Sequence, residues 1–172
     1  MNSLKKFTLA VCTLFLVGGT ALAQKVGIVN TAEILESIED YRSSQSELDR
    51  LADQWRQEIA QEHDKIKSEY NRYQAEQVLM SDEARRQKED QIIQMEQQVR
   101  DLQKRRFGPE GDLFERRREL VEPIQERVYK AIEDYADARD YDIILDKSSN
   151  AGLIFSNDKY DITRDVLREL GN

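Results

Sequence analysis

The residues able to do catalytic chemistry are few in this chain and are poorly placed for it. His63 is the only histidine, and its neighbours Glu62 and Asp64 would point to different faces of a helix. A catalytic triad or a metal site needs such groups to converge. The sequence also has no HExxH, no GxSxG, no nucleotide-binding fingerprint and no acidic calcium loop. We therefore expect no enzyme, no metal site and no cofactor.

A short apolar and basic cluster is the best candidate for a binding surface. Val78, Leu79 and Met80 are consecutive apolar residues within a polar, helix-forming region. If the chain reverses just after them, not all three can be buried, and a flexible methionine suits nonspecific contact with apolar segments. Arg85 and Arg86 would add a basic patch to the same tip. The alternative is that this tip packs against the neighbouring helix.

Aromatic residues precede this cluster at helical spacing. Trp55, Tyr70 and Tyr73 could form a stacking ladder for a ligand, although residues at this spacing more often pack two helices together. We include Tyr70 and Tyr73 in the candidate binding surface and leave both interpretations open.

These residues lie in a stretch of helix-forming sequence from Ser44 to Arg139. Neither Gly nor Pro occurs between Gly27 and Gly108. Apolar residues recur at steps of three and four, and an 11-residue repeat predicts nearly straight or slightly right-handed helices. That repeat consists of Leu48, Ile59 and Tyr70. The later residues with the 3-4-3-4 spacing of a coiled-coil seam are Ile92, Met95, Val99, Leu102 and Arg106.

A helix running unbroken from Thr31 to Arg106 would be roughly 110 Å long with its apolar stripe in water. Ser81, followed by Asp82, is the best internal helix cap. A reversal there predicts an antiparallel hairpin whose two helices bury each other's stripes. A parallel dimeric rod is the alternative, because the apolar phase continues through the cap without a clear jump.

Short strands and helices flank the hairpin. Strands are expected at residues 25–30, 142–146 and 152–156, with the pairing sense undetermined. Asn30 and Glu33 resemble a capping box that starts a helix, and a second cap at Ser44 makes a break near Ser43 as plausible as a continuous helix. Residues 108–111 interrupt the descending helix, a helix follows over 113–138 with Pro123 inside it, and Asp161 or Thr163 caps a last helix.

The predicted fold is therefore α+β and mostly α, with a long antiparallel coiled-coil hairpin inserted between strands of a small base. Residues 24–43 and 112–172 should form the base, and residues 44–111 the helical arm. Three short strands are too few to close a sheet or fill a core alone. We expect them to form a shared core between copies of the chain. Its candidate residues are Val26, Ile28, Ile143, Ile144, Leu145 and Ile154.

Residues 1–23 have the pattern of a cleaved secretory signal peptide. Lys5 and Lys6 precede an apolar core, and Ala21-Leu22-Ala23 forms a small-residue cleavage site. No later segment has the length and apolarity of a transmembrane helix. The one cysteine, Cys12, would leave with the leader, so the mature chain has no disulfide. The net charge of −8, with the excess of acid in the base, argues against nucleic acid as a partner.

The ends of the chain resemble the OmpH/Skp family of periplasmic chaperones. The segments that carry this resemblance are residues 25–35, 141–146, 152–157 and 160–167. It implies a periplasmic homotrimer with a central body and three helical hairpins around a cavity. It also implies an ATP-independent holdase that binds unfolded outer-membrane β-barrel proteins. A structural coiled-coil protein of the envelope that binds one defined partner is the alternative function.

One property of this chain departs from that family. The best-known members are strongly basic and are credited with binding lipopolysaccharide, whereas this chain is acidic. We therefore do not carry lipopolysaccharide binding over to it.

Overall fold

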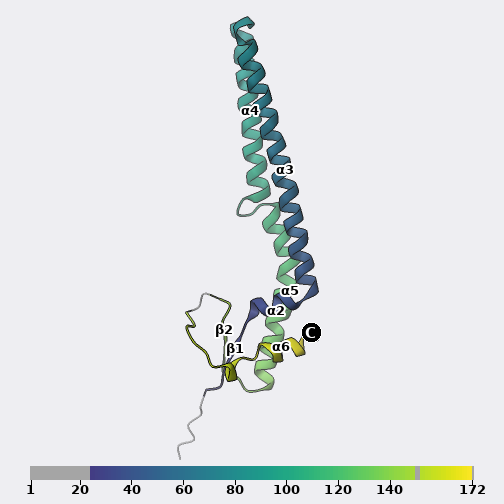
Figure 1. Ribbon diagram of the computed structural model, residues 1–172, viewed down its shortest axis with the longest axis vertical. Coiled ribbons are helices and arrows are strands. Elements are labelled where there is room, and N and C mark those ends of the chain that lie inside the picture. Colours follow the sequence, from purple (N-terminus) through teal and green to yellow (C-terminus); the bar gives the residue numbers. More distant parts are fainter. Residues whose placement is uncertain (1–23, 150–151, 172) are drawn as a thin grey trace, which may run out of the picture.

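The computed structural model describes residues 24–149 and 152–171, so the predicted signal peptide lies outside the described residues. Figure 1 shows a long helical hairpin above a small base that holds both strands. This arrangement confirms the predicted α+β, mostly α fold. In chain order the elements are β1 (Val26–Val29), α2 (Thr31–Ser37), α3 (Glu39–Glu76), η1 (Gln77–Leu79), α4 (Asp82–Phe107), α5 (Asp112–Ala138), β2 (Ile143–Asp146), η2 (Asp158–Tyr160) and α6 (Thr163–Glu169).

The two strands pair in parallel, which settles the pairing sense that the sequence left open. Val26 is opposite Ile143 and Val29 is opposite Asp146. The strand predicted at residues 152–156 is wrong, because that segment is irregular in this chain. The other edge of β1 is occupied near Ile28, whose carbonyl accepts a 2.8 Å hydrogen bond from the backbone N–H of Ile162. β1 therefore has no free edge for a third strand at that level.

The first helix, α2, starts where the sequence predicts and ends earlier than the sequence indicates. The Asn30 side chain accepts a 3.2 Å hydrogen bond from the backbone N–H of Glu33, as an N-cap does. The chain then breaks at Ile38, whose backbone is extended and whose side chain is 4% exposed. Of the two alternatives left open near Ser43, the structure has the continuous helix. The Ser44 hydroxyl lies inside α3 and donates to the carbonyl of Asp40 at 2.7 Å, so it caps nothing.

α3 is continuous, but two helices in succession cover it. α4 packs along its upper part and α5 along its lower part (Figure 1). The interruption predicted at residues 108–111 separates α4 from α5. α5 then runs through Pro123 without ending. The base is thus continuous with the arm through α3 and α5.

An apolar cluster at the lower end of α5 forms the core of the base. Burial of such side chains contributes about 1.5–3 kcal/mol each relative to exposure. Tyr135 adds a polar link to this core, because its hydroxyl donates to Asp165 at 2.8 Å. Burial, helped by the bond to Asp165, raises the pKa of Tyr135 to about 12. The buried members are Val29, Ile34, Ile38, Ile124, Val128, Tyr135, Ile162 and Val166.

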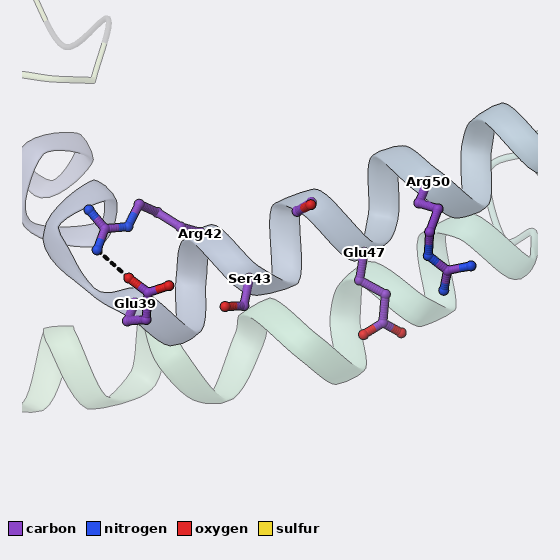
Figure 2. A pocket seen from close by; sticks show the side chains of 6 residues that line it. Glu39, Arg42, Ser43, Glu47 and Arg50 are labelled. Carbon is purple, nitrogen blue, oxygen red and sulfur yellow. Dashed lines mark hydrogen bonds and ion pairs between the residues drawn. The ribbon is translucent and has the colours of Figure 1, made fainter.

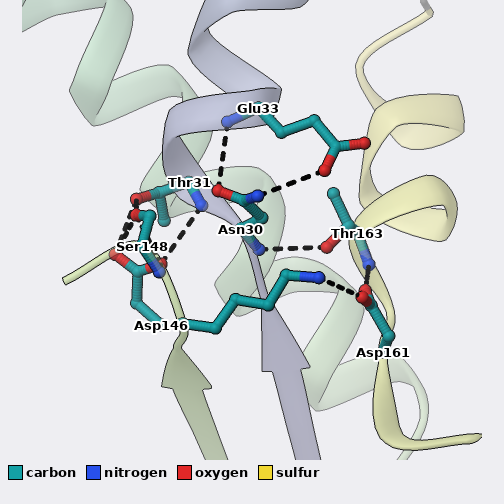
Figure 3. A network of polar contacts seen from close by, with 8 residues as sticks. Asn30, Thr31, Glu33, Asp146, Ser148, Asp161 and Thr163 are labelled. Carbon is teal, nitrogen blue, oxygen red and sulfur yellow. Dashed lines mark hydrogen bonds and ion pairs between the residues drawn. The ribbon is translucent and has the colours of Figure 1, made fainter. Parts of the chain in front are cut away.

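A polar network joins the end of β2 to the start of α2 (Figure 3). The Asp146 carboxylate accepts hydrogen bonds from the Thr31 hydroxyl at 2.6 Å and from the Ser148 backbone N–H at 2.9 Å. Burial acts to raise the pKa of Asp146, but these bonds outweigh it and hold the pKa below its ordinary value. The ionised carboxylate is therefore the form that the fold stabilises.

A second part of the network joins α6 to the ends of both strands (Figure 3). The Thr163 hydroxyl accepts from the backbone N–H of Asn30 at 3.0 Å, and Asp161 accepts from the backbone N–H of Thr163 at 2.9 Å. Lys147 donates to the other oxygen of Asp161 at 2.6 Å. The N-cap position of α6 is Ile162, which makes no side-chain cap, so neither Asp161 nor Thr163 is the N-cap that the sequence suggested. Asp161 bonds the N–H of the first helical residue from one position earlier.

Replacing Asp146 with Asn should lower the free energy of unfolding by about 1–2 kcal/mol, because the amide offers one acceptor oxygen where the carboxylate offers two. Because the pKa of Asp146 is lowered, its contribution to the free energy of unfolding is complete above the ordinary value of 3.8. That contribution is lost as the pH falls through the pKa of the folded state. Urea denaturation should show a difference between the variant and the wild type at pH 7 that shrinks below pH 3.8. Asp158→Asn is the matched control and should unfold like the wild type at both pH values.

Candidate functional site: the helical arm

The tip of the arm reverses where the sequence predicts. α3 gives way to the single turn η1, and the Ser81 hydroxyl accepts a 3.3 Å hydrogen bond from the backbone N–H of Ala84. Asp82 and Glu83 follow in the first turn of α4, where negative charge is favoured. The antiparallel hairpin is confirmed, and one unbroken rod is excluded.

The apolar residues of the tip fall into two groups. Val78 and Leu79 are 83% and 88% exposed, which leaves them free to touch another molecule. Met80 is partly buried and packs against the apolar cluster between the two helices. Arg85 and Arg86 are exposed close by, and Arg85 pairs with Asp82 of the same helix. The exposed part of the tip is therefore smaller than the sequence indicated.

The two tyrosines assigned to the candidate surface have different environments. Tyr70 is 50% exposed, whereas Tyr73 is 6% exposed. The Tyr73 hydroxyl donates to Glu89 of α4, and this bond raises the pKa of Tyr73. Tyr73 thus joins the two helices, and only Tyr70 is placed to contact a ligand.

The seam between α3 and α4 follows a seven-residue spacing. Ile59, Ile66 and Tyr73 are the buried residues that α3 contributes to this seam, each seven positions after the last. The predicted 11-residue repeat is wrong, because it included the half-exposed Tyr70. A seam between two helices selects the 3-4 spacing that keeps one stripe facing the partner, and α3 meets that condition over several turns.

A charged pair occupies one level of this seam. Lys88 lies 2.5 Å from Glu69, and their side chains are only 15% and 24% exposed. The bond from Lys88 is the main reason that the pKa of Glu69 is lowered. Sequence analysis did not find this pair. The available signal was that Glu69 lies four residues before Tyr73, on the stripe that α3 buries.

A second charged cluster lies where α4 ends. Arg106 donates to Asp112 of α5 at 2.6 Å and to Glu58 of α3 at 3.3 Å. Its guanidinium group also lies over the Trp55 ring, 4.8 Å from the ring centre. Trp55 meets Phe107 edge-on with 6.2 Å between ring centres. Trp55 is therefore a packing residue at the base of the arm, which favours the packing interpretation over a ligand ladder.

The lower part of α3 carries an open groove of a different character (Figure 2). Arg42 pairs with Glu39 there, and Glu47 pairs with Arg116 of α5 at 2.7 Å. Within residues 24–149 and 152–171, no three His, Cys, Asp or Glu side chains are close enough to hold a metal ion. The groove is lined by Glu39, Arg42, Ser43, Ser46, Glu47 and Arg50. Three of its four charged side chains are in ion pairs, and Arg50 bonds the neutral side chain of Gln54 at 3.3 Å.

The base presents apolar side chains to solvent along β2 and the segment after it. Ile143 and Leu145 are 42% and 43% exposed, and Ile154 and Phe155 are 99% and 82% exposed. Ile28, in contrast, is buried within its own chain. The other candidate core residues, Val26 and Ile144, are partly buried. One face of the base is therefore apolar and uncovered in the single chain.

Comparison with known families matches the model described as Outer membrane protein (OmpH-like) to residues 25–170. The chain belongs to the OmpH-like family. The family match spans both strands of the base and the whole arm, so it confirms the resemblance seen in the terminal segments. Of the parts of the chain that the structure describes, no helix combines the length and apolar character needed to cross a bilayer.

The OmpH-like fold is also found in a solved structure. A proposed outer membrane chaperone (OmpH-like) from Caulobacter crescentus CB15 aligns with a TM-score of 0.67 and 15% sequence identity. The alignment covers 89% of this chain and 88% of that one. The search of curated proteins gave no match. The low identity limits this likeness to the fold, which both chains share along most of their length.

The charged pair in the seam predicts a measurable coupling. Lys88→Met should lower the midpoint of thermal unfolding by several degrees, because Glu69 then lies in the seam without its main partner. Adding Glu69→Leu should restore the midpoint to the wild-type value or above it. Circular dichroism of the wild type, Lys88→Met, Glu69→Leu and the double variant gives the double-mutant cycle. Equal midpoints for Lys88→Met and the wild type would show that the pair contributes nothing.

Proposed function

We propose that this protein is a periplasmic holdase chaperone that works without ATP. Its clients would be unfolded outer-membrane β-barrel proteins, held between the arms of an assembled homotrimer. The observation that carries this proposal is a stable hairpin arm whose tip keeps apolar side chains in water, in a chain of the OmpH-like family.

The exposed apolar side chains of the arm suit such clients. Tyr70 and Ile93 are 50% and 57% exposed on the shaft, and Val78 and Leu79 are more exposed at the tip. Strands of an unfolded membrane barrel present alternating apolar side chains and free backbone edges in water. Dispersed, weak apolar contacts bind many such sequences, whereas a deep pocket would select one.

The uncovered face of the base supports assembly. A sheet of two four-residue strands is marginal in water, and the exposed side chains of Ile143, Leu145 and Phe155 would cost less free energy if another copy covered them. We propose that three copies join through this face. Residues 24–43 and 112–172 would then act as the body, and residues 44–111 as one arm of three.

The predicted signal peptide and the proposed clients both support a periplasmic location. Residues 1–23 have the pattern of a secretory signal peptide, and the proposed clients cross the same compartment. The acidic charge of the chain gives no support for lipopolysaccharide as a ligand, and we do not propose it.

Shortening the arms should impair client holding without disturbing the base. Deleting residues 62–68 together with residues 92–98 removes one seven-residue repeat from each helix and keeps the seam in phase. Each arm becomes about 10 Å shorter, at about 1.5 Å per residue. Light scattering of a denatured outer-membrane barrel protein, diluted from urea without ATP, should show suppressed aggregation by the wild type and weaker suppression by the shortened protein. The loss should be greatest for the largest clients.

Deleting residues 62–68 alone is the matched control, because it shifts α3 against α4 and should lower the thermal midpoint as well as the activity. Equal protection by the wild type and the in-phase deletion for barrels of every size would refute the role of the arms. Protection of one protein alone from a panel of unrelated barrels would favour the alternative of a structural protein with one defined partner.

A charge on the uncovered face of the base should block assembly. Phe155→Asp and Leu145→Asp place a carboxylate on side chains that are exposed in the single chain, so each chain should still fold. Burying that carboxylate between copies costs several kcal/mol, which should weaken association about 100-fold or more. Light scattering coupled to gel filtration should show trimers for the wild type and for Ile93→Asp, the control on the arm. Trimers of unchanged affinity for both base variants would place the interface elsewhere.

A further inference from the structure

The arm and the base have separate apolar cores. The seam cluster of the arm begins at Tyr73 near the tip and reaches down to Phe107, whereas the base cluster on α5 begins at Ile124. α3 passes between the two clusters without a break, while its partner changes from α4 to α5. The apolar residues that α3 buries between the two clusters, Leu48 and Ala52, belong to neither of them. The junction is therefore where the arm can change its direction relative to the base.

The connection at the junction is short and closely packed. A side chain on Gly108 would meet the Lys104 carbonyl oxygen at 2.4 Å, and one on Gly111 would meet the Arg105 carbonyl oxygen at 2.6 Å. α4 therefore ends tightly against the start of α5. Such a connection fixes the orientation of α4 relative to α5 as long as the neighbouring helices stay in place.

Arg106 is the side chain that ties the three helices together at this point. It comes from the last turn of α4, and its two terminal nitrogens bond Asp112 of α5 and Glu58 of α3. Its plane covers Trp55 of α3 as well. A planar guanidinium group makes these three contacts at once, which a lysine ammonium group does not.

The position of Arg106 has a cost in free energy. Among the described residues, the Arg106 Nε atom is buried without a hydrogen-bond partner. Glu58 and Asp112 are carboxylates on different helices that share this one cation. Without the positive charge they would repel each other across the junction. Arg106 is therefore one of two cations in the described part of the chain that link α3 to the first turns of α5, the other being Arg116, which bonds Glu47 at 2.7 Å.

We propose that Arg106, Glu58, Asp112 and Trp55 form an ionic latch that fixes the angle of the arm, and that salt or loss of one charge releases it. The released arm, α4 together with the upper part of α3, bends relative to the base at the level of Arg106, while both apolar cores stay intact. Its consequence for client size rests on the proposed function, because the angle of the arms would set the width of the space between them.

Trp55 reports the state of the latch directly, since it is the only tryptophan. Raising sodium chloride from about 0.1 M to about 1 M shortens the screening length from about 10 Å to about 3 Å. In the wild type this should red-shift the Trp55 emission and raise its quenching by acrylamide roughly twofold. Arg106→Met should show the high quenching at every salt concentration, with unchanged far-ultraviolet circular dichroism.

The angle of the arm is measured separately by electron spin resonance. Gln94→Cys and Arg117→Cys place two spin labels on exposed positions of α4 and α5, in a mature chain that has no other cysteine. Labelled chain is refolded with an excess of unlabelled chain, so that each assembly carries one labelled pair. Arg106→Met should broaden the distance distribution. Arg100→Met is the matched control, because Arg100 pairs with Glu96 inside α4, and it should leave the distribution narrow.

If Arg106→Met loses helical signal, Asp112→Asn and Glu58→Gln replace it in both measurements, since they keep Arg106 and its guanidinium group next to Trp55. Distance distributions of wild-type width in Arg106→Met, or in both replacement variants where they are needed, would overturn the latch. These readouts require no client. A protein that fails to hold clients but shows the salt-dependent release therefore contradicts the proposed function and leaves the latch standing.

Discussion

The structure depends on covering one apolar stripe that runs along α3. α3 spans 38 residues, and no other single helix of the described chain follows its whole length. The chain meets this requirement with two helices in succession, α4 above and α5 below. The turn at Ser81 brings α4 back along the upper part of α3. After the interruption at residues 108–111, α5 packs along the lower part. Both the projecting arm and its junction with the base follow from that division.

Local signals in the sequence predicted the elements whose ends are fixed locally. Asn30 and Ser81 cap helices as expected, and Gly108 ends α4, because each acts through its own or nearby backbone groups. Features set by distant contacts were missed. The chain breaks at Ile38, whose side chain lies in the base core, and residues 152–156 are irregular, so that β2 pairs with β1 alone among the described strands. Two of the seven residues of the candidate surface, Tyr73 and Met80, pack into the seam instead.

The arm shows how a surface for binding can be kept separate from the interactions that stabilise it. Its apolar seam and the pair of Glu69 and Lys88 face inward and define how the helices align. Its exposed side chains, such as that of Leu79, contribute little to folding. They can therefore change conformation to fit different ligands. A polar pair within an apolar seam favours one alignment over shifted ones, because a shift would bury each charge without its partner.

The parallel pairing of β1 and β2 also constrains the order in which the chain folds. The two strands are adjacent in space, yet Val26 and its partner Ile143 are separated by more than a hundred residues of helix. Contacts within the arm are between segments close in sequence and form early, whereas closing the sheet requires nearly the whole chain. As the polypeptide emerges from its N-terminus, β1 is the first of the described elements to appear and among the last to find its partner. Until then its backbone edge is unpaired, which is the same exposure that the folded protein is proposed to relieve in its clients.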